Sequence, residues 1–344
     1  MKQSYRVAFI GCGRRAQEHA KGVQADARCE VVAIADVKRE AAEAFKSEFG
    51  FAGDIYTDYQ TMLAEARPEV VIASLWTPLH LPVFQHCAEA GVQAVLSEKP
   101  MAPTWGECLA MARISEETGC RLTFCHQRRF SAGNKAIRSW IAEGRFGTIE
   151  RMDLYSPPNL LDCGTHTVDQ ALSYLGDIPV KWVLGAVDAS KPISYFNVSA
   201  EAMAVGTLVF ANGVRAALQV GGPDMDIWGG VRVTGSEGFV LADWGGVISR
   251  AVVYSDPAWQ PEAFPNEGKA EMEQVVSHAL DCLASGEEAE TSYQKALRAN
   301  EILFALYESV RRHARIELPL LGVTDNPFIT MLENGEFAGL LTAP

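Results

Sequence analysis

Short apolar runs alternate with longer amphipathic stretches along the first 125 residues. The apolar runs predict strands at Tyr5–Ile10, Glu30–Ala35, Val70–Leu75, Ala94–Ser97 and 121–125. The stretches between them predict helices near 15–26, 38–49, 58–66, 79–91 and 104–119. Strands that are apolar on both faces and alternate with helices are typical of a parallel sheet covered on both sides. We therefore expect an α/β domain over residues 1–124.

The pattern changes after residue 125. A helix near 134–143 precedes a strand near 148–156, and the region 181–254 is rich in short strands. Asn212-Gly213 between two apolar runs is a strong hairpin signal, and Gly235–Gly238 predicts a second hairpin. Helical periodicity returns at 270–285 and 291–313. Residues 125–344 are thus expected to form an α+β domain, with late helices near 291–313 packing back on the first domain. Residues 317–344 give no clear element.

Composition and charge narrow the class of protein. A chain of 344 residues with 48% hydrophobic and 21% charged residues suits two globular domains. The formal net charge of −13 disfavours nucleic acid and anionic membranes as partners. No apolar run reaches the ~20 residues of a membrane span, and the N-terminus lacks a signal-peptide layout. The eight cysteines form no C-x-x-C and the seven histidines no paired spacing, which predicts no metal site and a cytoplasmic location.

The run VAFIGCGRRA predicts a nucleotide site directly after the first strand. Gly11 permits a tight turn, Gly13 lets a pyrophosphate approach the backbone, and Ala16 allows close packing of the helix on the strand. The second strand ends at Asp36, 23 residues after Gly13. A carboxylate there can bind the adenosine ribose of NAD and repels a 2′-phosphate. The alternative is an ordinary βα turn with a helix-capping aspartate. Lys38 and Arg39 lie just beyond, so NADP stays open.

Lys99 follows the predicted strand 94–97 in the run SEKP. Ligands of open α/β sheets bind beyond the carboxyl ends of the strands. An ammonium group at that place can stabilise the alkoxide character that develops as hydride leaves an alcohol. The alternative is a solvated loop lysine.

The run LLDCGTHTVD at 160–169 places Asp162 and His166 four residues apart, on one face if the segment is helical. A helix-surface ion pair, a metal half-site and the acid–base end of an active site all fit these ten residues. A metal half-site loses support because no other ligand cluster is found in the sequence. Histidine is a suitable base for removing a hydroxyl proton near neutral pH.

Together, GCGRRA, Asp36, SEKP, HQRRF at 126–130 and LLDCGTHTVD resemble the Gfo/Idh/MocA family of oxidoreductases over residues 5–315. The resemblance implies a Rossmann domain followed by an α+β domain with a large open, mostly antiparallel sheet. It implies oxidation of a secondary alcohol of a sugar or cyclic polyol with NAD(P), or reduction of the corresponding ketone. It also implies a catalytic Lys99, often before a cis Pro100, and a D-x-x-x-H pair at Asp162 and His166. TPLH at 77–80 resembles the family's T-P-x-x-x-H stretch with one residue fewer. SPPNL at 156–160 replaces a run of glycines found in many members, which leaves the shape of the substrate pocket open.

On this interpretation His166 is the base, Lys99 the electrostatic stabiliser and proton-relay partner, and Asp162 the anchor. The expected cofactor contacts are Gly11, Gly13, Arg14, Arg15, Asp36, Trp76, Thr77, His80, Glu98 and Lys99. The expected substrate contacts are Arg128, Tyr155, Asn159 and Thr165, with Thr165 as an N-cap in the alternative. Asp169 is interpreted as structural or supporting, and His126 as a core or strand-end residue. Trp76, Trp228 and Trp244 fit either sugar stacking or buried packing.

Three functions compete. The leading one is an NAD(P)-dependent sugar or polyol dehydrogenase, with NAD as the cofactor and a homodimer or homotetramer as the assembly. The second keeps NAD but uses transient oxidation to assist elimination or glycoside hydrolysis without net redox. The third is a non-catalytic NAD(P)-binding regulator, which has no need for a lysine, an acid and a histidine at family positions.

Overall fold

The computed structural model describes residues 4–157, 159–221, 229–264 and 268–337. The chain forms two compact units. The first contains residues 1–103, 107–127 and 268–297, and the second contains 104–106, 128–267 and 298–344. The chain passes from the first unit to the long middle segment of the second at residues 127–128, three residues beyond the expected domain end at residue 124. The helix that returns to the first unit is α8 at Gly268–Ser285, whereas only the first turn of the helix expected near 291–313 belongs to it.

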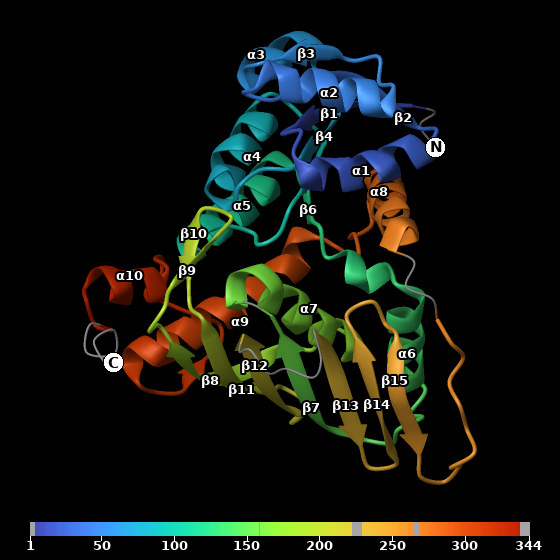
Figure 1. The fold of residues 1–344 in the computed structure, drawn as a ribbon, viewed down its shortest axis with the longest axis vertical. Coiled ribbons are helices and arrows are strands. Elements are labelled where there is room, and N and C mark those ends of the chain that lie inside the picture. Colours follow the sequence, from blue (N-terminus) through green and yellow to red (C-terminus); the bar gives the residue numbers. More distant parts are fainter. Residues whose placement is uncertain (1–3, 158, 222–228, 265–267, 338–344) are drawn as a thin grey trace. The chain divides into compact units, whose positions relative to one another are not determined.

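The first unit is built on a six-stranded parallel sheet (Figure 1). Its strands lie in the order β3-β2-β1-β4-β5-β6. Their bounds are Tyr5–Ile10 for β1, Cys29–Ala35 for β2, Asp54–Tyr56 for β3, Val70–Ala73 for β4, Ala94–Ser97 for β5 and Arg121–Phe124 for β6. This is the order of a dinucleotide-binding Rossmann sheet, with the switch point between β1 and β4. The expected α/β fold of this part is confirmed.

Helices cover this sheet, and the central strands β1, β4 and β5 are therefore buried along almost their whole length. They are α1 at Arg14–Ala25, α2 at Arg39–Phe49, α3 at Tyr59–Ala66, α4 at His80–Glu89, α5 at Trp105–Thr118 and α8 at Gly268–Ser285. Helix α8 packs directly on α1, where a Cβ on Gly22 would lie 2.6 Å from the carbonyl oxygen of Met272. Val276 and Leu280 of α8 join the core that includes Phe9 and Ile34.

The second unit contains an eight-stranded sheet in the order β15-β14-β13-β7-β12-β11-β8-β16. The strands are β7 at Ile149–Ser156, β8 at Val180–Asp188, β11 at Met203–Phe210, β12 at Arg215–Gly221, β13 at Gly230–Gly235, β14 at Gly238–Asp243, β15 at Ile248–Val253 and β16 at Ile316–Glu317. Only β7 and β12 pair in parallel among these neighbours. The expected large, mostly antiparallel sheet is therefore confirmed, and so are the hairpins β11–β12 and β13–β14.

One face of this sheet is buried under helices. Paired positions across the strands run from Gly185 through Gly206, Leu218 and Leu154 to Val231. A Cβ on Gly206 would lie 2.7 Å from Leu306 of α9, so the two glycines let this helix approach the sheet closely. The helices of the unit are α6 at Ala132–Ala142, α7 at Thr165–Tyr174, α9 at Tyr293–Arg312 and α10 at Pro327–Glu333. Short elements are η1 at Thr77–Leu79 in the first unit, η2 at Gln127–Phe130, η3 at Leu160–Gly164, and the two-stranded β9–β10 hairpin at Ile193–Tyr195 and Val198–Ala200.

Among the described residues, no helix combines the length and the apolar character needed to cross a membrane.

Candidate functional site

The turn after β1 has the geometry expected of a pyrophosphate-binding loop. Gly11 has φ +87°, and a Cβ there would lie 2.4 Å from the carbonyl oxygen of Ser74, so no other residue fits. Around Gly13 there is open space, since a Cβ would meet nothing within 4 Å. Gly13 precedes α1, and no side chain caps its first turn. The backbone N–H groups of Arg14 and Arg15 begin the helix, where an anion is favoured.

Asp36 lies beyond the end of β2 beside an apolar cavity of about 320 Å³. Its two carboxylate oxygens accept the backbone N–H groups of Cys12 and Lys38, each at 2.9 Å. The cavity is lined by Ile10, Gly11, Ala35, Asp36, Val37, Thr57, Tyr59, Leu75, Leu79, Pro82 and Val83. One carboxylate on the rim of an otherwise apolar cavity suits a flat heterocycle joined to a ribose. Sequence reasoning found Asp36 but missed the apolar wall, whose signal is exposed Val37 directly after a strand.

Beyond β4, the chain places Trp76, Thr77 and His80 in different surroundings. Trp76 is exposed, whereas Thr77 and His80 are buried. The two ring nitrogens of His80 lie 3.0 Å from the carbonyl oxygen of Pro100 and 3.2 Å from that of Leu75. Burial lowers the pKa of His80. His80 thus fastens the loop after β4 to the loop after β5, a structural role beside the cofactor role expected for it.

Lys99 follows β5, and its side chain is largely buried. The Lys99–Pro100 peptide bond is cis. The neighbouring Glu98 turns its carboxylate toward α1, where its Oε1 lies 2.9 Å from both Arg15 Nε and His19 Nε2. Burial opposes ionisation of Glu98, but His19, Arg15 and Lys99 outweigh it and lower its pKa to about 2.

His19 is a residue that sequence reasoning missed. It is fully buried on α1, three residues after Ala16. Burial opposes its positive charge, but Cys125 and Glu98 outweigh burial and raise the pKa of His19 to about 9. His19, Glu98 and Cys125 lie close enough to share a metal ion. The guanidinium of Arg15 already contacts both the carboxylate and the Cys125 thiol, at 2.9 and 3.5 Å, so a cation is present in the group without a metal.

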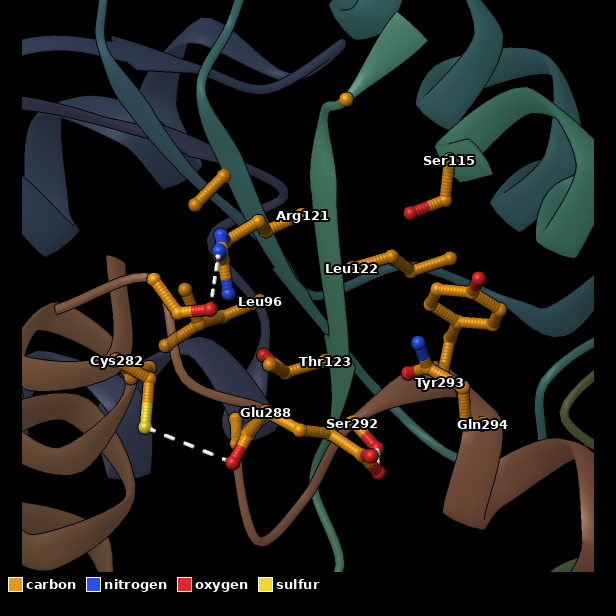
Figure 2. Close-up of a pocket in the computed structure, with 15 residues that line it drawn as sticks. Leu96, Ser115, Arg121, Leu122, Thr123, Cys282, Glu288, Ser292, Tyr293 and Gln294 are labelled. Atoms are coloured by element: carbon orange, nitrogen blue, oxygen red, sulfur yellow. Dashed lines mark hydrogen bonds between the residues drawn. The ribbon is translucent and has the colours of Figure 1, made fainter. Parts of the chain in front are cut away.

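A second cavity of the first unit, of about 290 Å³, lies along β5 and β6 (Figure 2). Figure 2 shows the Arg121 guanidinium directed at the loop before α9, where it donates to the carbonyls of Gly286 and Glu287. Cys282 and Ser292 likewise bond to Glu288. Arg121 is the first residue of β6, so this cavity reaches the amino end of the sheet, opposite to where Rossmann sheets bind nucleotides.

In the second unit, the run at 160–169 forms the start of a long helical segment. A π-helical turn, η3, continues directly into α7. Asn159 precedes it, and its side-chain oxygen accepts the N–H of Asp162 at 2.8 Å. Thr165 is the first residue of α7 and lies inside this continuous segment, whose N-cap is Asn159. The N-cap alternative for Thr165 is therefore wrong, because the chain is already helical before it.

His166 lies beside Trp244, with ring centroids 5.9 Å apart. The Trp244 indole donates to the Thr167 hydroxyl at 2.8 Å, which in turn donates to the carbonyl of Tyr155. Trp244 is buried, which favours the packing alternative for it; Trp228 lies outside the described residues. Asp162 and His166 are both largely buried.

The remaining expected substrate contacts are Tyr155 and Arg128. Tyr155 alternates along β7 with buried Leu154 and Ser156, so its side chain is on the other face of the strand. Arg128 is partly exposed in η2. Arg129 next to it is fully buried and pairs with Asp169 and Asp177 at 2.9 and 2.7 Å. This ion pair supports the structural interpretation of Asp169.

Comparison with known proteins agrees with this geometry. Residues 5–126 match the Gfo/Idh/MocA family model described as an oxidoreductase family with an NAD-binding Rossmann fold. The D-apiose dehydrogenase of Paraburkholderia graminis is 24% identical, over 96% of this chain and 94% of that enzyme. An inositol 2-dehydrogenase of Rhizobium meliloti is 29% identical, over 51% of this chain and 56% of the enzyme.

Solved structures share the fold over nearly the full length. The WlbA dehydrogenase from Bordetella pertussis, in complex with NADH and UDP-GlcNAcA, has a TM-score of 0.79 at 23% identity and covers 93% of this chain and 99% of its own. Levoglucosan dehydrogenase, in complex with NADH and levoglucosan, has a TM-score of 0.78 at 18% identity and covers 92% and 100%. The N-terminal part of the chain is therefore similar to the NAD-binding domain of Gfo/Idh/MocA oxidoreductases, and the fold of the whole chain is shared with these solved structures.

Proposed function

We propose that this protein is an NAD-dependent dehydrogenase of a sugar or cyclic polyol. The observation that carries the proposal is the pairing, in one unit, of a nucleotide cradle with a buried lysine beyond β5. The turn at Gly11, the open space at Gly13, and Asp36 beside its apolar cavity fit NAD. When bound, NAD supplies the hydride acceptor. The substrate class is that of relatives whose names include D-apiose and inositol dehydrogenases.

The protein's own residues manage the proton and the charge on the substrate. His166 removes the proton from the reacting hydroxyl, and Lys99 stabilises the negative charge that grows on the oxygen. Asp162 binds a neighbouring hydroxyl or orients the imidazole. Lys99 belongs to the first unit, whereas His166 and Asp162 belong to the second. In the proposed reaction, all three side chains contact the substrate.

Asp36 favours NAD over NADP because its carboxylate would repel the 2′-phosphate on the adenosine ribose of NADP. Arg39, which could offset that charge, is paired with Glu43 along α2 at 3.0 Å. We also propose a reducing, cytoplasmic setting, because the cysteines are scattered along the chain without a disulfide-framework spacing. We also propose an oligomer through the open face of the large sheet, where Leu184 and Val205 are 47% and 43% exposed.

A panel of sugars and inositols with NAD or NADP tests the function, followed by absorbance of the reduced cofactor. We expect NAD to be reduced by a member of the panel. Lys99→Ala and His166→Ala should each lower kcat by about a hundredfold or more, as loss of acid–base or charge-stabilising groups does. Arg113→Ala, on α5, is a control that should leave turnover unchanged. Full activity in both active-site variants would refute the proposed roles, and turnover without accumulating NADH would instead favour transient oxidation.

A further inference from the structure

Glu201 is a fully buried carboxylate that the proposed chemistry does not use. It lies between β10 and β11, and its two oxygens have different partners. Oε1 accepts the backbone N–H of Leu160 at 2.7 Å, and Oε2 accepts the hydroxyl of Tyr307 at 2.5 Å. Burying an ionised carboxylate is costly unless donors satisfy it, so such a group needs an explanation.

The Leu160 end of this arrangement is the start of the segment that carries Asp162 and His166. Leu160 is the first residue of η3, whose N–H groups have no partner within the helix. Asn159 supplies one acceptor, to Asp162, and Glu201 supplies the other, to Leu160. A negative charge at this end of the helix is also favoured by the helix dipole.

The Tyr307 end anchors the carboxylate to the core of the second unit. Tyr307 is fully buried on α9, and its ring packs on Phe328 with centroids 5.4 Å apart. Burial and the neighbouring Glu201 hold its pKa well above the ordinary value, so its hydroxyl remains a donor. The adjacent Leu306 packs against Gly185 and Gly206 of the sheet. Glu201 thus joins a firmly packed helix to the start of η3.

We propose that Glu201 is a positioning residue, whose carboxylate, anchored by Tyr307, fixes the start of the segment that holds Asp162 and His166 for reaction with the substrate. The inference rests on the proposed function. It assigns Glu201 no contact with substrate or cofactor.

The ionised form of Glu201 is the one that fits this arrangement. Both partners are donors, so a proton added to the carboxyl would point at another donor and leave one hydrogen bond unmade. Tyr307 is the titratable side chain that bonds to Glu201 in the described part of the chain, and it stays protonated. Burial raises the pKa of Glu201 to about 7 against the opposing hydrogen bonds from Tyr307 and Leu160. The hold on η3 is therefore expected to weaken as the pH falls below about 7.

The test compares Glu201→Gln, Tyr307→Phe and a matched control, Glu301→Gln. Glu301 is a glutamate on α9 whose carboxylate also accepts a backbone N–H, from Leu320 at 2.8 Å, away from η3. Two readouts are needed on the full-length protein. One is kcat and the KM values for sugar and NAD at pH 8, and the other is hydrogen exchange of the amides of 160–166 between pH 6 and 8.

Glu201→Gln should lower kcat by about tenfold or more, since small misplacements of catalytic groups are costly, and leave the KM for NAD unchanged. The protection factors of the amides of 160–166, which are corrected for the intrinsic pH dependence of exchange, should be lower than in the wild type at pH 8 and should no longer vary with pH. The thermal midpoint of each variant at pH 8 is measured as well, so that kcat is compared at a temperature where all the variants are folded. Tyr307→Phe should show a smaller effect of the same kind, and Glu301→Gln neither.

Unchanged exchange at 160–166 in Glu201→Gln overturns the proposal, whatever the activity. Faster exchange with unchanged kcat overturns it as well. If Glu201→Gln does not fold, Tyr307→Phe decides by the same two criteria. If the wild type oxidises no sugar, the proposed function fails, and the exchange data alone decide whether Glu201 holds η3.

Discussion

At Asp36, one carboxylate stabilises the protein and, in the proposed function, also binds a ligand. It accepts the N–H groups of Cys12, inside the Gly11–Gly13 turn, and of Lys38, just after β2, and it borders the apolar cavity. A carboxylate can accept about four hydrogen bonds, so two ribose hydroxyls can still be bound. In the proposed function, loop shape and cofactor choice therefore depend on the same side chain.

Asp36→Asn should weaken NAD binding and relax the discrimination against NADP. The amide keeps one acceptor but loses the charge, and hydrogen bonds to a charged group contribute about 1.5–3 kcal/mol. We expect the KM for NAD to rise on the order of tenfold, and the ratio of the KM values for NADP and NAD to fall. Asp54→Asn, at the exposed start of β3, is the control. An unchanged KM for NAD would show that Asp36 does not contact the cofactor.

Single residues also show where sequence reasoning reaches its limit. Gly11, Asp36 and Lys99 were found because their neighbours in sequence identify them. His19 and Glu201 were not, because their partners Glu98 and Tyr307 are 79 and 106 residues away. Nothing in a local pattern distinguishes a buried glutamate from a solvated one.

At the scale of elements, the Glu98 contacts join α1 to the loop after β5. Arg15 and His19 lie one helical turn apart on α1, so both reach the same carboxylate. The Gly11–Gly13 turn and the strand end that carries Lys99 are thereby held together within the first unit. Any shift of α1 would be transmitted to the residue next to Lys99.

This pairing predicts a pH-dependent stability. The pKa of His19 is raised from 6.5 to about 9 by folding, so its contribution is complete below pH 6.5 and lost as the pH rises through 9. The pKa of Glu98 is lowered to about 2, so its contribution is present above pH 4.5 and lost as the pH falls through 2. Between pH 5 and 6, the contributions of His19 and Glu98 to the free energy of unfolding are therefore both complete. The shift of His19 corresponds to about 3 kcal/mol at most.

We expect the thermal midpoint of His19→Asn to lie below that of the wild type at pH 6, and the gap to narrow by pH 10. His86→Asn, on α4 of the same unit, is the control, whose difference from the wild type should not follow this course. A gap that stays constant from pH 6 to 10 would mean that His19 is neutral in the folded protein.

The sequence pattern predicts the long, periodic helices and strands correctly and misses short ones. The five strands expected in the first unit are present, but β3 at Asp54–Tyr56 was missed because three residues carry no pattern. The run at 160–169 is helical, which is the condition under which Asp162 and His166 share a face, yet its π-helical turn has no signal in the periodicity. One of the two contacts at its start comes from Glu201, which is distant in sequence. The α10 helix at 327–333 was also missed, although Asn326 and Pro327 form a capped start.

At the scale of the whole molecule, the open sheet face is the surface on which assembly would depend. Leu184 and Val205 lie on neighbouring antiparallel strands, on the face opposite to Gly185 and Gly206. The exposed side chains named here are apolar, whereas the chain as a whole is acidic. Its net charge alone would make two copies repel each other. Burial of this face would outweigh that repulsion.

The double variant Leu184→Glu/Val205→Glu should therefore shift the protein from a dimer or tetramer toward the monomer. Sedimentation velocity measures the change directly. Leu109→Glu alters an exposed leucine of α5 in the first unit and should leave the assembly unchanged. A wild type that sediments as a monomer would refute the expected oligomer.

The position of α8 in the sequence has a consequence for biosynthesis. This helix completes the first unit, since Val276 and Leu280 fill a core begun by Phe9 and Ile34, yet it is translated only after most of the second unit. The nascent Rossmann sheet thus leaves the ribosome before α8 has been synthesised, with α1 still uncovered. Until α8 packs on α1, this surface is accessible to chaperones. A fragment ending at residue 127 lacks α8, so this apolar surface would stay exposed and the fragment should aggregate. Simple truncation is therefore not expected to yield a well-folded Rossmann unit.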